Sequence, residues 1–492
     1  YADLDASGAF AAEIAPGPYL VRAELRDRAR SQIVAIELGS SGVSDIALTL
    51  PSPIRFDYTI SDGASGGVIP GKLVVIGRHP VSPDPRLFDT HDRVANMIGM
   101  VMAGHGTSVD IGDGADPQLV LPAGGTYRVI ATRGTQWSFD SVRLDATTTG
   151  GALDFTLFQV APSAGYVASE YHVHQLGSPD SPVSSKDRAL SAAAAGIELF
   201  ATTDHDYVSD LEPLIQELGI DRWVRAIPGI EVTPFVYGHF NAWPIEPDPD
   251  SPNHGAVDWA AGEPGYAKTP GQIFQAMRDR GAELVQVNHP RAGAGFSFQE
   301  FFDRAGITYD YANRVISADL SQAPVPREWL RLPDEPLWDP SFNALEVWNG
   351  FRTADSNNDG VREVESLDRV MRDWFNFLSF GMPLVPCGNS DTHTLVADSM
   401  GMPRTYVRVG DATYQALNDA IADGSVVDEV LATLTGVGAA KDVVVSNAPF
   451  LTVRRAGETT SAIGATYAGS GTISFEVTIT SPEWAEFDTL EV

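Results

Sequence analysis

Hydrophobic positions follow two different rhythms along this chain. Up to about residue 160, short runs such as YLVRAEL, GKLVVIG and TYRVIATRG are apolar or alternate with polar residues, and turns such as PGP, SDGASGG and PAGG separate them. Runs of this length bounded by Gly and Pro are typical of β-strands. We therefore expect two small all-β sandwich modules here, residues 1–52 and 53–162.

The pattern then changes to strands that alternate with amphipathic helices. SSKDRALSAAAAG predicts a helix with a Ser cap and a Gly terminator, followed by the strand IELFATT. TPGQIFQAMRDRG repeats this unit, with Thr269 as N-cap, Pro270 at the first helical position and Gln272 placed for a capping box. This alternation predicts an α/β domain over residues 163–446. Runs of β character return in FLTVRRAG and TISFEVTI, which predict a C-terminal β module over 447–492.

Charge and cysteine content narrow the function classes. The chain has 492 residues, and 33 Lys and Arg against 65 Asp and Glu give a formal net charge of -32, so we expect no nucleic-acid partner, because binding of phosphate backbones depends on cationic contacts. The single Cys387 excludes an internal disulfide framework, and no apolar run reaches the ~20 residues of a membrane span. Acidic β modules favour a periplasmic or secreted location. No signal peptide is visible before Tyr1, and we therefore expect the sequence to be a processed chain or an excised fragment.

Six of the ten histidines fall at predicted strand ends in the middle region, in YHVH, TDHD, GHFNAW, VQVNHP and SDTH. Sites assemble at the carboxyl ends of strands in parallel α/β folds. Side chains two apart on a strand point to the same face, so His172 and His174 can both reach one metal ion. For any one histidine the alternative is a surface position or a hydrogen-bonded place in the core. The candidate ligands are His172, His174, Asp180, His205, Glu231, His239, His289, Asp391 and His393.

The order of these motifs resembles the polymerase and histidinol phosphatase (PHP) family of metallohydrolases. YHVHQLGSPDSPVS, GIELFATTDHDYVSDL, GNSDTH and GMPRTYV look most like its CehA/McbA branch, which includes a carbaryl hydrolase. The resemblance covers roughly residues 165–450. It implies a distorted seven-stranded (β/α) barrel, flanked here by the small β-sandwich modules, with two or three divalent ions, usually zinc, manganese or iron.

The resemblance also implies a ligand set for each ion. The first would use His172, His174, Glu231 and Asp391; the second would share Glu231 and add His239 and His289; the third would use Asp180, His205 and His393. Some relatives have His in place of Asp180. Mixed imidazole and carboxylate ligands suit zinc, manganese and iron(II) about equally.

Two such ions can share a hydroxide, because the pKa of bound water falls from 15.7 to about 7. The resulting expectation is a hydrolase that cleaves an ester, carbamate or amide bond in a small molecule. The alternative among enzymes is a phosphomonoesterase or phosphodiesterase, which the small number of motif-adjacent arginines (Arg291, Arg352 and Arg404) disfavours. The alternative of another class is an exported binding or adhesion protein with the barrel as a scaffold.

Three further features have two interpretations each. Asp204, beside His205, either orients a ligand and moves a proton or caps a strand end. Arg291 and Arg352 either contact an anionic or carbonyl group of the substrate or neutralise part of an acidic domain.

DSNNDGVREVES is similar to a calcium loop, with Asp355, Asn357 and Asp359 as the first ligands, but Ser366 stands where a bidentate Glu belongs. The alternative there is a solvated turn.

Overall fold

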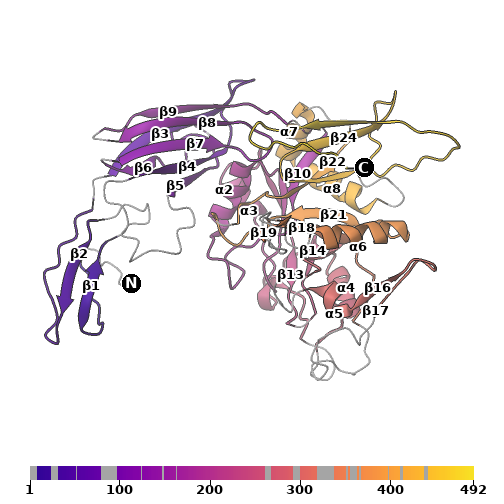
Figure 1. Ribbon diagram of the computed structural model, residues 1–492, viewed down its shortest axis with the longest axis horizontal. Coiled ribbons are helices and arrows are strands. Elements are labelled where there is room, and N and C mark those ends of the chain that lie inside the picture. The colour runs from indigo at the N-terminus through magenta and orange to yellow at the C-terminus, as the bar shows by residue number, and fades with distance from the viewer. Residues whose placement is uncertain are drawn as a thin grey trace.

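The computed structural model shows a β-rich N-terminal part and a larger α/β domain (Figure 1). It describes residues 8–23, 31–50, 53–78, 97–161 and 163–491, apart from 113, 124, 147–148, 164, 236, 261–266, 292–299, 319–336, 351–352, 355–362, 365–366, 397, 411–413 and 437–441.

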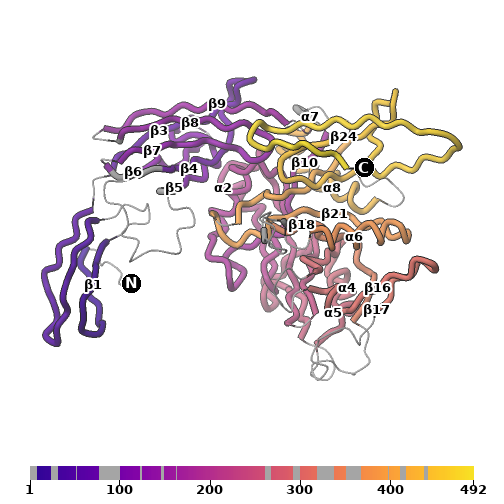
Figure 2. Tube along the Cα trace, in the orientation of Figure 1, coloured from indigo at the N-terminus to yellow at the C-terminus, as the bar shows by residue number. Residues whose placement is uncertain are grey.

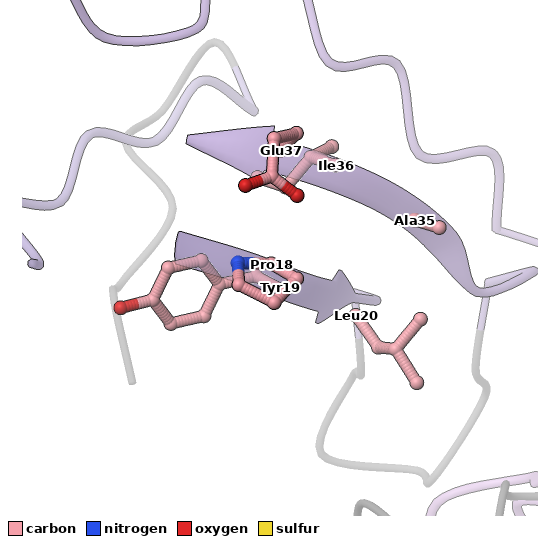
Figure 3. A pocket seen from close by; sticks show the side chains of 6 residues that line it. All are labelled: Pro18, Tyr19, Leu20, Ala35, Ile36 and Glu37. Atoms are coloured by element: carbon pink, nitrogen blue, oxygen red, sulfur yellow. The ribbon is translucent and has the colours of Figure 1, made fainter. Parts of the chain in front are cut away.

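The N-terminal segment contains one antiparallel hairpin that extends away from the rest of the molecule (Figure 1). Its strands are β1 (Gly17–Val21) and β2 (Val34–Leu38). A shallow open hollow on this hairpin is lined by Pro18, Tyr19, Leu20, Ala35, Ile36 and Glu37 (Figure 3). It contains none of the candidate ligands, so the functional site has to be sought elsewhere.

Two sheets form a β-sandwich between residues 53 and 157. The first has the order β6-β3-β9 and the second the order β5-β4-β7-β8. The strands are β3 (Pro53–Asp62), β4 (Gly71–Arg78), β5 (Met97–Ala103), β6 (Leu119–Pro122), β7 (Gly125–Thr132), β8 (Phe139–Ala146) and β9 (Ala152–Leu157). Buried and exposed residues alternate along β7 and β9, so one face of each sheet supplies the shared core.

The α/β domain is built on two five-stranded sheets, with the orders β12-β11-β10-β22-β23 and β13-β14-β15-β18-β21. The strands of the first are β10 (Tyr166–Glu170), β11 (Leu199–Thr202), β12 (Arg225–Pro228), β22 (Arg404–Arg408) and β23 (Val443–Ser446). Those of the second are β13 (Ile230–Val232), β14 (Phe240–Trp243), β15 (Leu284–Val287), β18 (Ala344–Asn349) and β21 (Val385–Asn389). Strands β10, β11, β15 and β21 are buried along their whole length, as expected for strands covered on both faces.

This arrangement differs from the expected barrel of seven parallel strands. Neighbours run parallel in β10–β11–β12 and β15–β18–β21, but β13–β14–β15 and β10–β22–β23 are antiparallel. β13 and β14 are joined by a short hairpin, and short connections without a helix produce antiparallel neighbours. The fold is therefore a mixed α/β structure, and among the described residues the strands form no single closed sheet.

Helices cover these sheets where the capping signals predicted them. α2 (Ser185–Ala195) has Ser184 as N-cap and ends at Gly196, whose φ of 67° is the left-handed conformation that glycine favours. α4 (Pro270–Asp279) has the predicted capping box between Thr269 and Gln272. The others are α3 (Glu212–Glu217), η1 (Pro252–His254), α5 (Phe301–Ala305), α6 (Leu367–Ser379), α7 (Tyr414–Asp423) and α8 (Val426–Thr435). Within the described ranges, none of the helices combines the length and apolarity that a membrane span requires.

Three further hairpins complete the structure: β16 (Ile307–Asp310) with β17 (Val315–Ala318), β19 (Thr353–Ala354) with β20 (Glu363–Val364), and β24 (Phe450–Arg455) with β25 (Phe475–Thr480). The last lies at the C-terminal, yellow end of the trace (Figure 2). It packs on the α/β domain through Phe450, whose ring meets those of Tyr166 and Tyr406 edge-on.

The sandwich is fixed to the α/β domain by two buried or partly buried cations. Arg133 donates to the carbonyl of Pro70 in the sandwich and to that of Ala193 in α2. His105 Nδ1 lies 3.1 Å from Asp116 Oδ1, and its Nε2 lies 2.7 Å from the carbonyl oxygen of Leu218 beyond α3. Because both ring nitrogens face acceptors, only the imidazolium form donates to both.

This geometry predicts a pH-dependent domain contact. The hydrogen bond to Asp116 raises the pKa of His105 above its usual range, against opposing effects of burial and Arg222. The stabilisation is therefore complete below the unfolded-state pKa of about 6.5 and is lost as pH rises through the raised folded-state value. We expect His105→Gln to lower the unfolding temperature of the sandwich at pH 5.5 by ~4 °C, equivalent to roughly 1 kcal/mol, and much less at pH 9. Calorimetry at both pH values measures this, and an equal decrease at both would contradict it. Asp116→Asn should remove the same pH dependence.

Candidate metal centre

The nine candidate ligands lie where six strands meet at one edge of the domain. His172 and His174 follow β10, His205 follows β11, and His289 follows β15. Asp391 and His393 follow β21, Glu231 lies within β13, and Asp180 lies in the turn before α2. His239 was expected at the end of a strand but directly precedes β14. The antiparallel pairing of β13 with β14 still brings it to the same edge as Glu231.

Two isolated parallel bridges join the two sheets at this edge. Val173, between the first two histidines, pairs with Thr392, and His205 pairs with Glu231. Arg188 of α2 reinforces the first junction, since its guanidinium donates to the carbonyl oxygens of His174 and Thr392. The ligand loops are thus held by backbone pairing and not only by their own side chains.

Four fully buried or nearly buried groups converge most closely. His172 Nε2 lies 3.3 Å from Glu231 Oε1 and 3.2 Å from Asp391 Oδ1. His174 Nε2 lies 3.4 Å from Glu231 Oε2 and 3.3 Å from Asp391 Oδ1. Two imidazole nitrogens and two carboxylates therefore surround one point.

Glu231 also faces the remaining histidines of the second sheet. Its Oε1 lies 3.3 Å from His239 Nδ1 and 3.7 Å from His289 Nε2. This is the position of a carboxylate that can serve two adjacent ions.

Asp180 and two further histidines lie on the solvent side of the cluster. The Nε2 atoms of His205 and His393 are each 3.4 Å from Asp180 Oδ2, and the ring of His393 stacks on that of His174 at 3.9 Å between centroids. Asp180 is 55% exposed, whereas His174 is buried. The cluster is therefore open to solvent beside Asp180.

Four overlapping groups of three residues have ligand atoms within 4.8 Å of one another: His172, His174 and Asp391; His172, Glu231 and His289; His205, Glu231 and His239; and His174, His205 and His393. The overlap differs from the sets that the family resemblance implies, which share only Glu231, because His172, His174 and His205 each belong to two of the four groups. All of the implied ligands nevertheless lie in this one cluster.

The donor atoms fit a divalent metal. Among the described residues, the Nε2 atoms of His172, His174 and His393 are buried without a well-aligned hydrogen-bond partner. Buried polar atoms nearly always have a partner, so these atoms form the kind of donor set that a divalent cation completes. Imidazole and carboxylate together suit zinc, manganese and iron(II).

Hydrogen bonds at the far side of each ring determine which nitrogen of the HxH pair is free. His172 Nδ1 lies 2.8 Å from Oε1 of Glu346, which can only accept while it is ionised. His174 Nδ1 lies 2.9 Å from Ser178 Oγ, whose own proton goes to Asp204 Oδ1 at 2.9 Å. Both rings must therefore carry their proton on Nδ1, which leaves both Nε2 lone pairs for a metal.

Sequence reasoning missed Glu346, a buried residue of β18. Its Oε1 also accepts from Asn389 Nδ2 at 2.9 Å, and its Oε2 accepts from the backbone N–H of His289 at 2.7 Å and from Asn349 Nδ2 at 2.9 Å. Four donors occupy its two oxygens, so Glu346 orients ligands and is not free to bind an ion. A charged residue inside the apolar run ALEVWN is the signal that could have identified it.

Amides extend this layer beneath the ligands. Asn288 donates to Glu231 Oε1 at 2.7 Å and to Asn241 Oδ1 at 2.7 Å, and Gln286 donates to Asn288 at 2.8 Å. Asn241 in turn donates to the carbonyl of Tyr171, the residue before His172. The central carboxylate is thus held from behind by side chains of β14 and β15.

The electrostatics of the cluster show how strongly its charges depend on one another. Burial would raise the pKa of Glu231, but the imidazoles, His205 first, hold it well below its usual range, and His172 does the same for Asp391. Burial would lower the pKa of His172, yet the carboxylates, Asp391 first, raise it well above 6.5. Burial would also lower the pKa of His205, but Glu231 raises it to about 9. For His174 the effect of burial prevails and lowers the pKa to about 4. Without an ion, protons on some imidazoles neutralise the carboxylates, so metal binding has to release them.

The two predicted catalytic residues occupy different positions from the ligands. Asp204 is buried and accepts from Gln175 N at 2.8 Å as well as from Ser178, so it acts on His174 through that hydroxyl. Arg291 donates through Nε and Nη2 to Asp373 and through Nη1 to Asp303. Its guanidinium is engaged in this ion-pair network, as its second interpretation, neutralisation of part of an acidic domain, describes, and its contact with a substrate stays a prediction.

Two other predictions lie outside the described residues: the possible calcium loop at Asp355, Asn357 and Asp359, and the alternative roles of Arg352.

Comparison with solved structures gives distant matches. No protein-family model matches the chain, and no curated protein matches it. Among solved structures, a two-domain protein from Bacteroides vulgatus containing a predicted PHP-like metal-dependent phosphoesterase is 15% identical, with 65% of this chain and 89% of that chain covered at a TM-score of 0.30. Endonuclease Q, in complex with a 27-mer duplex carrying an abasic lesion, is 14% identical, with 52% and 57% covered at a TM-score of 0.26. At these scores neither likeness assigns a family, a CehA/McbA relationship or an activity.

Replacement of Glu346 tests the orienting layer. In Glu346→Gln the new amide must direct its NH₂ at two of the four donors that surround it, so His172 loses its fixed orientation. We expect metal affinity to fall ~10–100-fold, the range typical for partners of metal ligands. Competition with a chromophoric chelator measures this. Glu198→Gln is the matched control, because Glu198 has one oxygen bound by a single backbone N–H, that of Ala168. Equal affinities of the two variants would show that Glu346 has no orienting role.

Proposed function

We propose that this chain is a metal-dependent hydrolase of the PHP type, similar to the CehA/McbA branch, that cleaves an ester, carbamate or amide bond in a small molecule. The observation that carries the proposal is the convergence of nine histidine, aspartate and glutamate side chains, with buried Nε2 atoms that lack a partner among the described residues. A distorted PHP barrel that accommodates the two mixed sheets belongs to the same proposal.

Two or three divalent ions would be held by this cluster. His172, His174 and Asp391 would hold the first with Glu231, and Glu231 would extend to a second beside His239 and His289. Asp180, His205 and His393 would hold a third on the solvent side. A divalent ion in such a site lowers the pKa of a water molecule and polarises the bond to be cleaved.

The chain's own residues would contribute orientation, exclusion of water and an approach route. Glu346 and Ser178 keep the Nδ1 protons away from the centre, and Asn288 holds the central carboxylate in place. His172 and His174 are fully buried, whereas His289 and His393 are partly exposed. A substrate would therefore approach from the side of His289 and His393.

The placement of cations favours a carbon-centred substrate over a phosphate ester. Arg188 is bound to the ligand loops, and Arg291 is paired with two carboxylates. Arg404 donates to the carbonyls of Gly401, Gly196 and Ala195. Among the described arginines near the motifs, each is therefore engaged by protein oxygens, while phosphoryl transfer generally uses cations that contact the substrate. The net charge of -32 also disfavours a nucleic-acid substrate.

Substitution of both HxH histidines tests the assignment. We expect the His172→Ala, His174→Ala double variant to lose metal content and at least ~10³-fold in kcat/KM together, because a catalytic ion supplies several kcal/mol of transition-state stabilisation. Metal analysis should accompany assays with p-nitrophenyl acetate, naphthyl carbamate, p-nitrophenyl phosphate and its bis ester, with and without chelator. His105→Gln, outside the cluster, should remain active.

A double variant that stays active and metal-replete would refute the centre. If the protein cleaves only the phosphate esters, and a chelator abolishes that cleavage, the substrate class is a phosphate ester and the proposed carbon-centred substrate is wrong.

A further inference from the structure

Lys72, one of only four lysines in the chain, lies in the middle of a sheet of the sandwich. In β4 it pairs with Met102 of β5 on one side and with Thr132 of β7 on the other. Its neighbour Leu73 and the next residue but one after that, Val75, are fully buried in the sandwich core. Because successive side chains of a strand point to opposite faces, the side chain of Lys72 lies on the face away from this core.

Helix α2 of the α/β domain packs against β4 and β5 on that outer face (Figure 1). Met102, directly opposite Lys72, packs against the group of buried side chains that includes Leu190 of α2. Leu190 also lies close to the backbone just after β5, since a β-carbon on Gly104 would be 2.3 Å from Leu190 Cδ2. Lys72 is therefore a partly buried lysine at the junction of the sandwich with the α/β domain.

A second cation lies at the same junction. Arg404 donates to the carbonyl oxygen of Ala195 at the end of α2. Gly134, two residues after the Thr132 that pairs with Lys72, comes close to both groups. A β-carbon on Gly134 would lie 2.1 Å from the carbonyl oxygen of Ala195 and 2.8 Å from Arg404 Nη2. The end of β7 thus brings the guanidinium of Arg404 near the ammonium of Lys72.

No acidic group balances the charge of Lys72 within the described part of the chain. Its Nζ has no hydrogen-bond acceptor or ion-pair partner there, and the charge that acts on it is that of Arg404. The carboxylate of Glu198 acts on Arg133 and Arg404 instead. Burial lowers the pKa of Lys72, and the like charge of Arg404 lowers it further. The amine is therefore uncharged, and so nucleophilic, more often than that of an exposed lysine.

We propose that Nζ of Lys72 is a carboxylation site, which takes up carbon dioxide reversibly as a carbamate. The uncharged nitrogen attacks the carbon of carbon dioxide, a C–N bond forms, one C=O electron pair moves to oxygen, and the nitrogen loses a proton to water. The side chain changes from a cation to an anion, so repulsion by Arg404 becomes attraction. An acyl group would only remove the repulsion, which favours carbon dioxide over an acyl donor. The site is independent of the proposed hydrolase activity.

Chemical trapping tests the site in the intact protein. The protein is equilibrated with isotopically labelled bicarbonate at neutral pH, treated with triethyloxonium ion, which converts carbamates to stable ethyl esters, and then digested for mass spectrometry. We expect ~10-fold more labelled ester on Lys72 than on Lys186, an exposed lysine of α2 that serves as the matched control. Equal labelling of the two lysines, or none on Lys72, would overturn the inference. This comparison is made within the wild-type protein and needs no variant to fold.

Thermal unfolding gives a second test. A group that binds only the folded state stabilises it, so the wild-type protein should unfold at a temperature about 2 °C higher in bicarbonate than in chloride of equal ionic strength and pH. The difference should vanish in Lys72→Arg, because a guanidinium stays protonated and forms no carbamate, and it should persist in Lys186→Arg. A bicarbonate effect of equal size in both variants would overturn the inference.

Discussion

The carboxylate of Glu231, buried among five imidazoles, is the constraint on which the rest of the site depends. It lies within 4 Å of ring nitrogens of His172, His174, His205, His239 and His289. A buried carboxylate is costly unless opposite charge accompanies it, and here the charge can come from protons on the rings or from metal ions.

The layer behind the ligands determines what this cluster can bind. Glu346 and Ser178 both accept from an Nδ1 atom, so the two rings of the HxH pair present the same nitrogen to the centre. Asp204 supports Ser178, and Asn288 supports Glu231. The ligands therefore have little freedom to reorient, and such preorganisation increases affinity by lowering the entropy lost on binding.

Much of the site could be predicted from the sequence, and less of the fold. The HxH spacing on a strand and the positions of Asp391, His289 and His205 at strand ends follow from local periodicity, so these residues could be brought together without coordinates. The strand directions could not, since GHFNAW reads equally well as parallel or antiparallel until its partner is known. The bonds of Glu346 to His172 and His289 and the pairing of Arg291 with Asp373 join residues 57 or more positions apart along the chain, which no local pattern encodes.

The candidate metal ligands come from both five-stranded sheets of the α/β domain. Each of the four metal-ligand groups combines residues from the β10–β11 side with residues from the β13–β21 side. An ion bound at any of them would join the two sheets at the edge where Val173 pairs with Thr392. Cofactor loading would then be part of the cohesion of the domain.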